Sequence, residues 1–85
     1  MEIQIPAWFK YRQGVVEPAG DNSYKVSAPV SDPAIIRIRQ VYGKWQAAVA
    51  DSVEGPDLHA TESQFSRPND AWNAAFELYR TLRIL

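Results

Sequence analysis

The chain has 85 residues, nine basic and ten acidic side chains and a formal net charge of -1, so it is small and nearly neutral. That balance argues against a protein whose whole surface coats nucleic acid. The absence of cysteine excludes disulfides and cysteine-based zinc or iron–sulfur sites. We predict one domain over residues 1–85, in which three Trp, four Tyr and three Phe supply much of a small core.

We expect a cytoplasmic protein with no membrane partner. No apolar stretch approaches the roughly 20 residues that a membrane-spanning helix needs. The first six residues hold an early acid and no long apolar run, unlike a secretion signal. A chain without cysteine is also compatible with a reducing compartment.

The first predicted strand covers residues 3–13. Pro6 interrupts it, which suits a sheet edge because proline cannot donate to the ladder. With Phe9 and Tyr11 facing the core, alternation turns their neighbours outward. An outward tryptophan between cations would serve either as an anchor for a partner or as a cover for the sheet edge, and the sequence leaves both roles open. The outward residues are Trp8, Lys10 and Arg12.

A second, shorter strand is predicted between two connecting segments. Residues 17–22 are rich in turn formers and are predicted to form a loop. Residues 24–28 alternate apolar and polar side chains, which predicts a strand with Lys25 on its polar side. Residues 29–33 contain two prolines and are predicted to be a non-helical connection.

The strongest pattern is a β-hairpin over residues 35–50. Two β-prone runs flank Gly43-Lys44, and glycine at the first central position predicts a two-residue type II′ turn. This turn would pair Tyr42 with Trp45, and Ile38 with Val49. Alternation then predicts one face for the core and one for solvent. The core face carries Ile36, Ile38, Tyr42, Trp45, Ala47 and Val49, and the opposite face carries Arg37, Arg39, Val41, Gln46, Ala48 and Ala50.

The last third of the chain changes from strand to helix. A turn is predicted at residues 54–57, followed by a weak, polar edge strand over residues 58–65. Beyond it, apolar residues recur at intervals of three and four, which predicts a helix. Ser66 with Asn69 predicts an N-terminal cap, and Pro68 fits the first turn. The apolar face of this helix carries Trp72, Ala75, Phe76, Tyr79 and Leu82.

Together these elements predict an α+β fold. A small antiparallel sheet of three to five strands would have one C-terminal α-helix packed on one face. Additional apolar residues make the helix stripe wider than one small sheet needs, so the surplus could serve a homodimer. They are Ala71, Ala74, Leu78 and Leu85.

Residues for catalysis are scarce. With one histidine, no cysteine and four isolated glycines, the chain lacks Cys–His nucleophiles, histidine-rich metal sites and glycine-rich phosphate loops. The one histidine–carboxylate cluster is His59 with Asp57 and Glu62, which also fits a solvated edge strand. We therefore predict a non-enzymatic protein without cofactor or metal, and keep an enzyme that uses His59 as a hypothesis to test.

The clearest functional signal is a set of basic residues that the predicted strands gather on the sheet face away from the helix. Such residues also keep exposed strands from aggregating. As a binding site they suit an acidic protein surface, so we predict a small binding protein, such as an adaptor, an inhibitor or an accessory protein of a phage or mobile element. The alternative is a nucleic-acid-binding domain that contacts phosphates through its arginines. The partner-binding set is Trp8, Lys10, Arg12, Lys25, Arg37, Arg39 and Lys44.

Three stretches carry a resemblance to a known family: residues 42–51 (YGKWQAAVAD), Phe65, and residues 70–76 (DAWNAAF). They resemble the plant ethylene-response-factor DNA-binding domain and, more distantly, the arm-binding domain of tyrosine integrases, over residues 37–80. The resemblance implies a three-stranded sheet that docks in the DNA major groove, with a C-terminal helix behind it. The DNA-contacting positions of the family, mostly Arg with Trp and Glu, align with Ile38, Gln40, Tyr42, Ala48 and Ala50.

Overall fold

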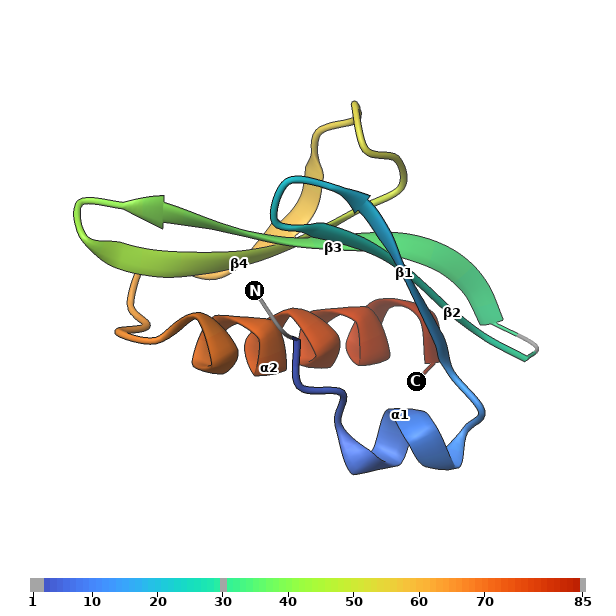
Figure 1. Ribbon diagram of the computed structural model, residues 1–85. Helices are drawn as coiled ribbons and strands as arrows, with labels where there is room; N and C mark the ends of the chain where they lie inside the picture. The colour runs from blue at the N-terminus through green and yellow to red at the C-terminus, as the bar shows by residue number, and fades with distance from the viewer. Residues whose placement is uncertain (1–2, 30, 85) are drawn as a thin grey trace.

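The computed structural model describes residues 3–29 and 31–84. Five antiparallel strands form one sheet in sequence order (Figure 1). A short helix precedes the sheet, and a longer one follows it and continues into a π-helical turn. The predicted α+β fold, with a C-terminal helix packed on the sheet, is confirmed. The elements are α1 (Ala7–Tyr11), β1 (Val15–Gly20), β2 (Ser23–Ala28), β3 (Ser31–Val41), β4 (Lys44–Ala50), β5 (Asp57–Ala60), α2 (Pro68–Tyr79) and the π-helical turn Arg80–Ile84.

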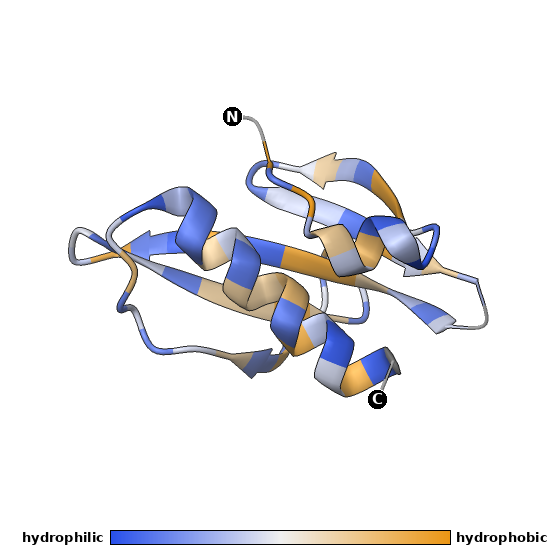
Figure 2. Cartoon of the chain, turned by 90° about the horizontal axis from the view of Figure 1, so that it is seen from below, coloured by the Kyte–Doolittle hydropathy of each residue, from blue (hydrophilic) through white to orange (hydrophobic). Residues whose placement is uncertain are grey.

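Both helices lie on the same face of the sheet. Figure 2, seen from the helix side, shows α1 under the β1–β2 part and α2 across β3 and β4. The core fills the space between them and the sheet, and its largest buried side chains come from both helices and three strands. These side chains are Trp72, Tyr79, Phe9, Phe76, Ile36, Val26 and Val49. No helix in the described ranges is long and apolar enough to cross a membrane.

The predicted first strand is wrong, because α1 forms within it. Pro6, with φ -60° and ψ 148°, precedes the helix, and its carbonyl accepts hydrogen bonds from the Phe9 and Lys10 amides. The helix turns Phe9 into the core, where its ring lies 5.2 Å from that of Phe76 and 5.8 Å from that of Tyr79. This packing outweighs the β propensity of the aromatic residues. Tyr11, predicted to face the core, is 90% exposed.

The loop predicted at residues 17–22 is also wrong for most of its length. Residues 17–20 belong to β1, which pairs with β2 and has an irregular register between Pro18 and Gly20. Proline is tolerated here because β1 is an edge strand. The turn itself is confined to Asp21 and Asn22, and Asn22 has a φ of +53°.

The central hairpin forms, but its turn lies one residue earlier than predicted. Tyr42 and Gly43 occupy the two central positions with φ of +52° and +82°, as in a type I′ turn. Ile38 therefore pairs with Ala47 instead of Val49. Moving the turn by one residue shifts the pairing along β4 by two residues. Because side chains alternate with a period of two, the paired residues keep their predicted faces. Tyr42, predicted to face the core, is fully exposed in the turn.

The face away from α2 is not simply solvated. Ile35, Ala48 and Ala50 point to this face and are nevertheless buried. The segment between β4 and β5 rises on this side of the sheet (Figure 1), and Arg37 from the central strand donates hydrogen bonds to its carbonyls. This face therefore holds a second, smaller set of buried apolar residues that alternation alone assigned to solvent.

The C-terminal helix follows its predicted apolar stripe. Trp72, Ala75, Phe76 and Tyr79 are buried against the sheet, and Pro68 is the first helical residue. The predicted Ser66 cap is wrong. The N-cap residue is Arg67 and makes no side-chain cap, whereas the Ser66 hydroxyl accepts a hydrogen bond from Lys44.

The predicted edge strand at residues 58–65 is shorter than expected. It is confined to β5, which pairs with the end of β4, while Phe65 forms an isolated bridge to Trp45.

Candidate functional site

The seven predicted partner-binding residues do not share one surface. Trp8, Lys10 and Arg12 belong to α1 or its end and lie on the α2 side of the sheet (Figure 1). The register places the other four on the opposite face or at the hairpin tip. The cause is the replacement of the predicted first strand by a helix, which carries its side chains away from the strand cations. The second group comprises Lys25, Arg37, Arg39 and Lys44.

Arg37 is held by its own chain. Its Nε donates to Asp57 Oδ1 at 2.8 Å, Nη1 to the Val53 carbonyl at 2.9 Å, and Nη2 to the Gly55 carbonyl at 2.7 Å. The side chain is 16% exposed. Arg37 therefore fixes the segment between β4 and β5, and its charge is paired within the chain in this structure.

Arg39 contacts the same carboxylate from the other side. It donates to Asp57 Oδ2 and, through Nε, to the Gln46 amide oxygen at 2.8 Å. Burial raises the pKa of the Asp57 carboxyl, but the hydrogen bonds and charges of Arg37 and Arg39 outweigh burial and lower the pKa below its ordinary value of 3.8. The predicted basic face is thus partly neutralised by an internal acid.

This arrangement predicts a pH dependence of stability. A carboxyl with a lowered folded-state pKa contributes stability that is fully present above its unfolded pKa, about 3.9, and is lost as the pH falls through the folded pKa. We expect Asp57→Asn to be less stable than the original protein by a constant amount between about pH 7 and 5, and by a shrinking amount below about pH 4. Urea midpoints across this range measure the difference.

Glu54→Gln is the matched control for this prediction. Glu54 is an exposed carboxylate of the same segment and makes no ion pair within the described ranges, so its loss should change stability by less than about 0.5 kcal/mol at each pH. A stability difference between Asp57→Asn and the original protein that persists unchanged under acid would contradict the pairing.

The two lysines of the second group are more accessible. Lys25 is exposed and lies opposite Glu17 on one side and Ile35 on the other in the strand register. Lys44, at the hairpin tip, donates to the Ser66 hydroxyl at 3.0 Å. An acid faces Lys25 across the strand pair, so the local charge at this position is close to balanced.

Trp8 is half-buried and covers the core. Its ring meets those of Phe9 and Phe76 edge to face, at centroid distances of 5.6 and 6.5 Å. The Arg80 guanidinium lies over the same ring, 5.7 Å from its centroid. Trp8 therefore joins the core on one side and a surface arginine on the other.

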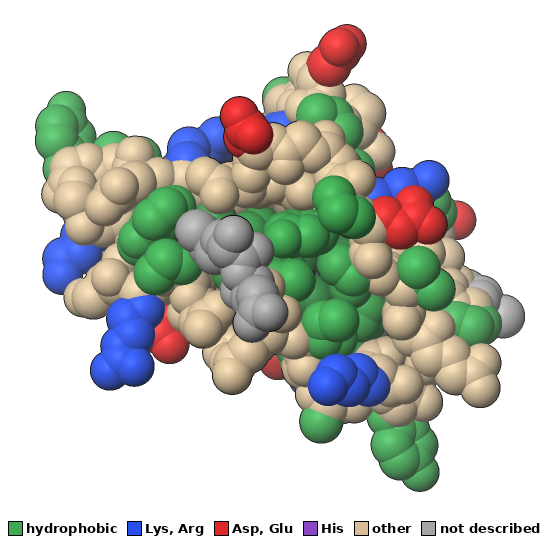
Figure 3. Space-filling model, in the orientation of Figure 1, with side chains coloured by type: hydrophobic (Ala, Val, Ile, Leu, Met, Phe, Trp, Pro, Cys, Tyr) green, Lys and Arg blue, Asp and Glu red, His purple; other side chains and the backbone are tan. Residues whose placement is uncertain are grey.

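A shallow pocket of about 400 Å³ opens beside Trp8. Tyr11 projects from α1 at its edge, and Arg12 and Arg80 add two cations. Figure 3 shows basic and hydrophobic side chains next to one another over α1. The sequence does not indicate Tyr11, because strand alternation predicts that its side chain faces the core. It does not indicate Arg80 either, since no local pattern links Arg80 to Trp8. The spacing of Trp8, Tyr11 and Arg12, at i, i+3 and i+4, is the signal that would have grouped them on one side of a helix.

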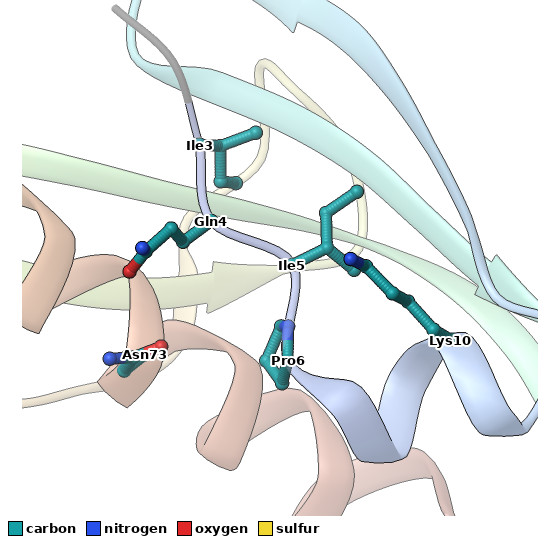
Figure 4. Close-up of a pocket in the computed structure, with 6 residues that line it drawn as sticks. All are labelled: Ile3, Gln4, Ile5, Pro6, Lys10 and Asn73. Atoms are coloured by element: carbon teal, nitrogen blue, oxygen red, sulfur yellow. The ribbon is translucent and has the colours of Figure 1, made fainter.

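Lys10 lies apart from this pocket. It lines another open hollow with Ile3, Gln4, Ile5, Pro6 and Asn73. The Gln4 and Asn73 amides lie on one side of the N-terminal segment, whereas the Lys10 ammonium lies beside Ile5 on the other (Figure 4). The polar groups do not converge on a common point, so the hollow lacks the arrangement of a ligand site.

The His59 cluster is not assembled. The register is irregular between Val49 and Ala50, so His59 faces the α2 side while Asp57 faces Arg37 on the other side. His59 lines a pocket of about 240 Å³ with Leu78, Thr81 and Leu82. Asp57 is therefore not placed to orient the imidazole as a catalytic base. Within the described ranges, no group of three or more potential metal-ligating residues occurs.

The proposed dimer stripe is occupied within the chain. Ala71 is buried, and Ala74 and Leu78 pack against the core as half-buried residues. Leu85 lies outside the described residues. The stripe therefore offers less free apolar surface than its sequence pattern suggests.

Comparison of the chain with protein-family models, curated proteins and solved structures finds no match.

Proposed function

We propose that the protein is a small, non-enzymatic, cytoplasmic binding protein that acts through protein–protein contact at the α1 surface. The α1 surface is defined here as Trp8, Tyr11, Arg12 and Arg80. The observation that carries the proposal is Tyr11, which is 90% exposed beside a pocket bordered by a half-buried tryptophan and two arginines. Tyr, Trp and Arg are the residue types that dominate binding energy at protein interfaces.

The charges of the α1 surface favour an acidic partner. The pocket lining holds two arginines and no carboxylate. Arg80 has one ion pair within the described ranges, to Glu77 at 3.6 Å between exposed side chains, and such pairs contribute at most about 1 kcal/mol. Both arginines therefore remain available for a carboxylate of a partner, next to apolar area that can receive a side chain.

Selection of peptides tests the proposal. A displayed library of random peptides is selected on the original protein, with Tyr11→Ala/Arg12→Glu as the counter-selection bait. We expect enrichment of peptides that combine Asp or Glu with an aromatic or large aliphatic residue. Their affinity for the double variant should be at least about tenfold lower, a loss of about 1.4 kcal/mol.

The hairpin tip offers a matched control. The turn between β3 and β4 lies far from α1 (Figure 1) and carries an exposed tyrosine, Tyr42, and an exposed cation, Lys44, so Tyr42→Asn/Lys44→Glu makes a comparable change elsewhere. This control should bind the selected peptides as the original protein does. Failure to enrich any peptide, or equal binding to the α1 double variant, would contradict the proposal.

The alternative proposal is nucleic-acid binding through the sheet face away from α2. It is supported by Arg39, which is 47% exposed, and by Lys25 on the same face, together with the resemblance to the ethylene-response-factor family. The pairing of Arg37 and Arg39 with Asp57 weighs against it, so we place it second.

Titration of the original protein with labelled duplex and single-stranded DNA across a salt series separates the two proposals. Micromolar affinity with a log–log salt slope of about -3 or steeper would favour the nucleic-acid proposal. No binding at about 50 mM salt would exclude it.

A further inference from the structure

The arginine–carboxylate cluster on the sheet face away from α2 joins side chains of a central strand to one of an edge strand. Arg37 and Arg39 stand two residues apart on β3, a central strand that pairs on both sides, so both guanidiniums point to the same face. Asp57 is the first residue of the edge strand β5, where it pairs with Ala50, and it directly follows the irregular segment 51–56. The cations are therefore placed by a central strand, while their anion comes from the start of an edge strand.

The charges of this cluster do not balance. Two guanidiniums face one carboxylate, so the cluster retains one net positive charge. Arginine forks recognise carboxylate and phosphate oxygens with the same geometry. Asp57 uses one oxygen for Arg37 and the other for Arg39, as a bound oxyanion would. A phosphate group would supply more negative charge and more acceptor oxygens at the same place.

We propose that Arg37 and Arg39 form a phosphate-binding site that Asp57 occupies in the isolated protein. Asp57 thus acts as an internal substitute for the ligand. Binding of a phosphate group requires the carboxylate to be displaced or removed. The phosphate group comes either from free phosphate or from a nucleic-acid backbone. This site is separate from the α1 surface and does not depend on the protein-binding proposal.

Removal of the internal carboxylate tests the site directly. Asp57→Asn is compared with Glu54→Gln, which removes the same charge from the same segment without touching the arginines. Inorganic phosphate is titrated at constant ionic strength, and the Arg37 and Arg39 Nε–H resonances are followed by NMR. We expect saturable shifts in Asp57→Asn, with an apparent Kd at least tenfold lower than in Glu54→Gln. Equal responses of the two variants would overturn the proposal.

A DNA titration of the same two variants identifies the source of the phosphate. If the site takes a nucleic-acid backbone, Asp57→Asn binds labelled duplex DNA more tightly than Glu54→Gln, with a salt slope steeper by about 1 to 2 units. If phosphate shifts the arginine resonances but DNA affinity is equal in both variants, free phosphate is the ligand. Either result supports the site.

A loss of folding in Asp57→Asn leaves the proposal testable. Arg37 keeps its bonds to the Val53 and Gly55 carbonyls in this variant, which favours a folded protein. If the variant is unfolded in chloride, far-ultraviolet circular dichroism is recorded in phosphate at the same ionic strength. Because phosphate also stabilises folded proteins by exclusion from their surface, Asp57→Asn/Arg39→Gln is measured beside it. Refolding of Asp57→Asn alone in phosphate supports the site, whereas equal refolding of both variants, or of neither, contradicts it.

Discussion

Phe76→Ala is expected to lower the free energy of unfolding by about 3–5 kcal/mol, the usual cost of removing a large buried aromatic side chain. Phe76 is fully buried, and its ring lies 5.2 Å from that of Phe9 and 6.5 Å from that of Trp8. It therefore joins α1 to α2, and its loss leaves a cavity that two helices must close. A domain of this size has about 5–15 kcal/mol of stability, so the variant should be close to unfolding.

Urea denaturation followed by tryptophan fluorescence measures this effect. Tyr11→Ala serves as the control, because it also removes an aromatic ring from the helical layer but from an exposed position. The control should change stability by less than about 0.5 kcal/mol. A cost below about 1 kcal/mol for Phe76→Ala would show that the two helices do not share the packed layer described above.

Gly14→Ala is expected to destabilise the protein by about 1–3 kcal/mol, the cost of forcing extra volume into a packed site. A Cβ at Gly14 would lie 2.4–2.5 Å from three carbons of the Phe9 ring. The ring is fully buried and held by Trp8, Phe76 and Tyr79, so it cannot move aside freely. Glycine is required here because the chain after α1 passes directly over the Phe9 ring.

A double-mutant cycle with Phe9→Leu checks this cause. Leucine lacks Cε2 and Cζ, two of the three ring carbons that the new Cβ would meet, so Gly14→Ala should cost at least about 1 kcal/mol less in the Phe9→Leu background. Urea midpoints of the four proteins measure the coupling. An identical cost of Gly14→Ala in both backgrounds would place the strain in the backbone instead of in the contact with Phe9.

The candidate site was only partly predictable from the sequence. The sequence predicts Trp8 and Arg12 as partner-binding residues, and the structure brings these two together. Their neighbours in the pocket are Tyr11 and Arg80 instead of the predicted strand cations. Strand alternation predicts that the Tyr11 side chain faces the core. Over so short a segment, the two-residue period of a strand is hard to distinguish from the roughly 3.6-residue period of a helix. Arg80 could not be predicted, since its place over the Trp8 ring depends on where the π-helical turn Arg80–Ile84 lies relative to α1.

Long periodic patterns in the sequence are enough to predict β3, β4 and α2. Alternation assigned the faces of β3 and β4 correctly even though the turn slipped to Tyr42-Gly43, because a slip of two residues preserves which side each residue faces. The three- and four-residue spacing of Trp72, Phe76 and Tyr79 located α2. Each pattern involves residues that are close together in the sequence. It repeats often enough that one residue that departs from it does not change the predicted element.

The remaining features depend on contacts between segments that are far apart in the sequence. Helix α1 is stabilised because the Phe9 side chain packs in the core against Phe76 and Tyr79. The charge of the sheet face depends on Asp57, which is 18 and 20 residues away from the two arginines whose charge it partly neutralises. No local pattern links residues so far apart in sequence, and their interaction energy arises only once the strands are paired and the segment between β4 and β5 has folded over them.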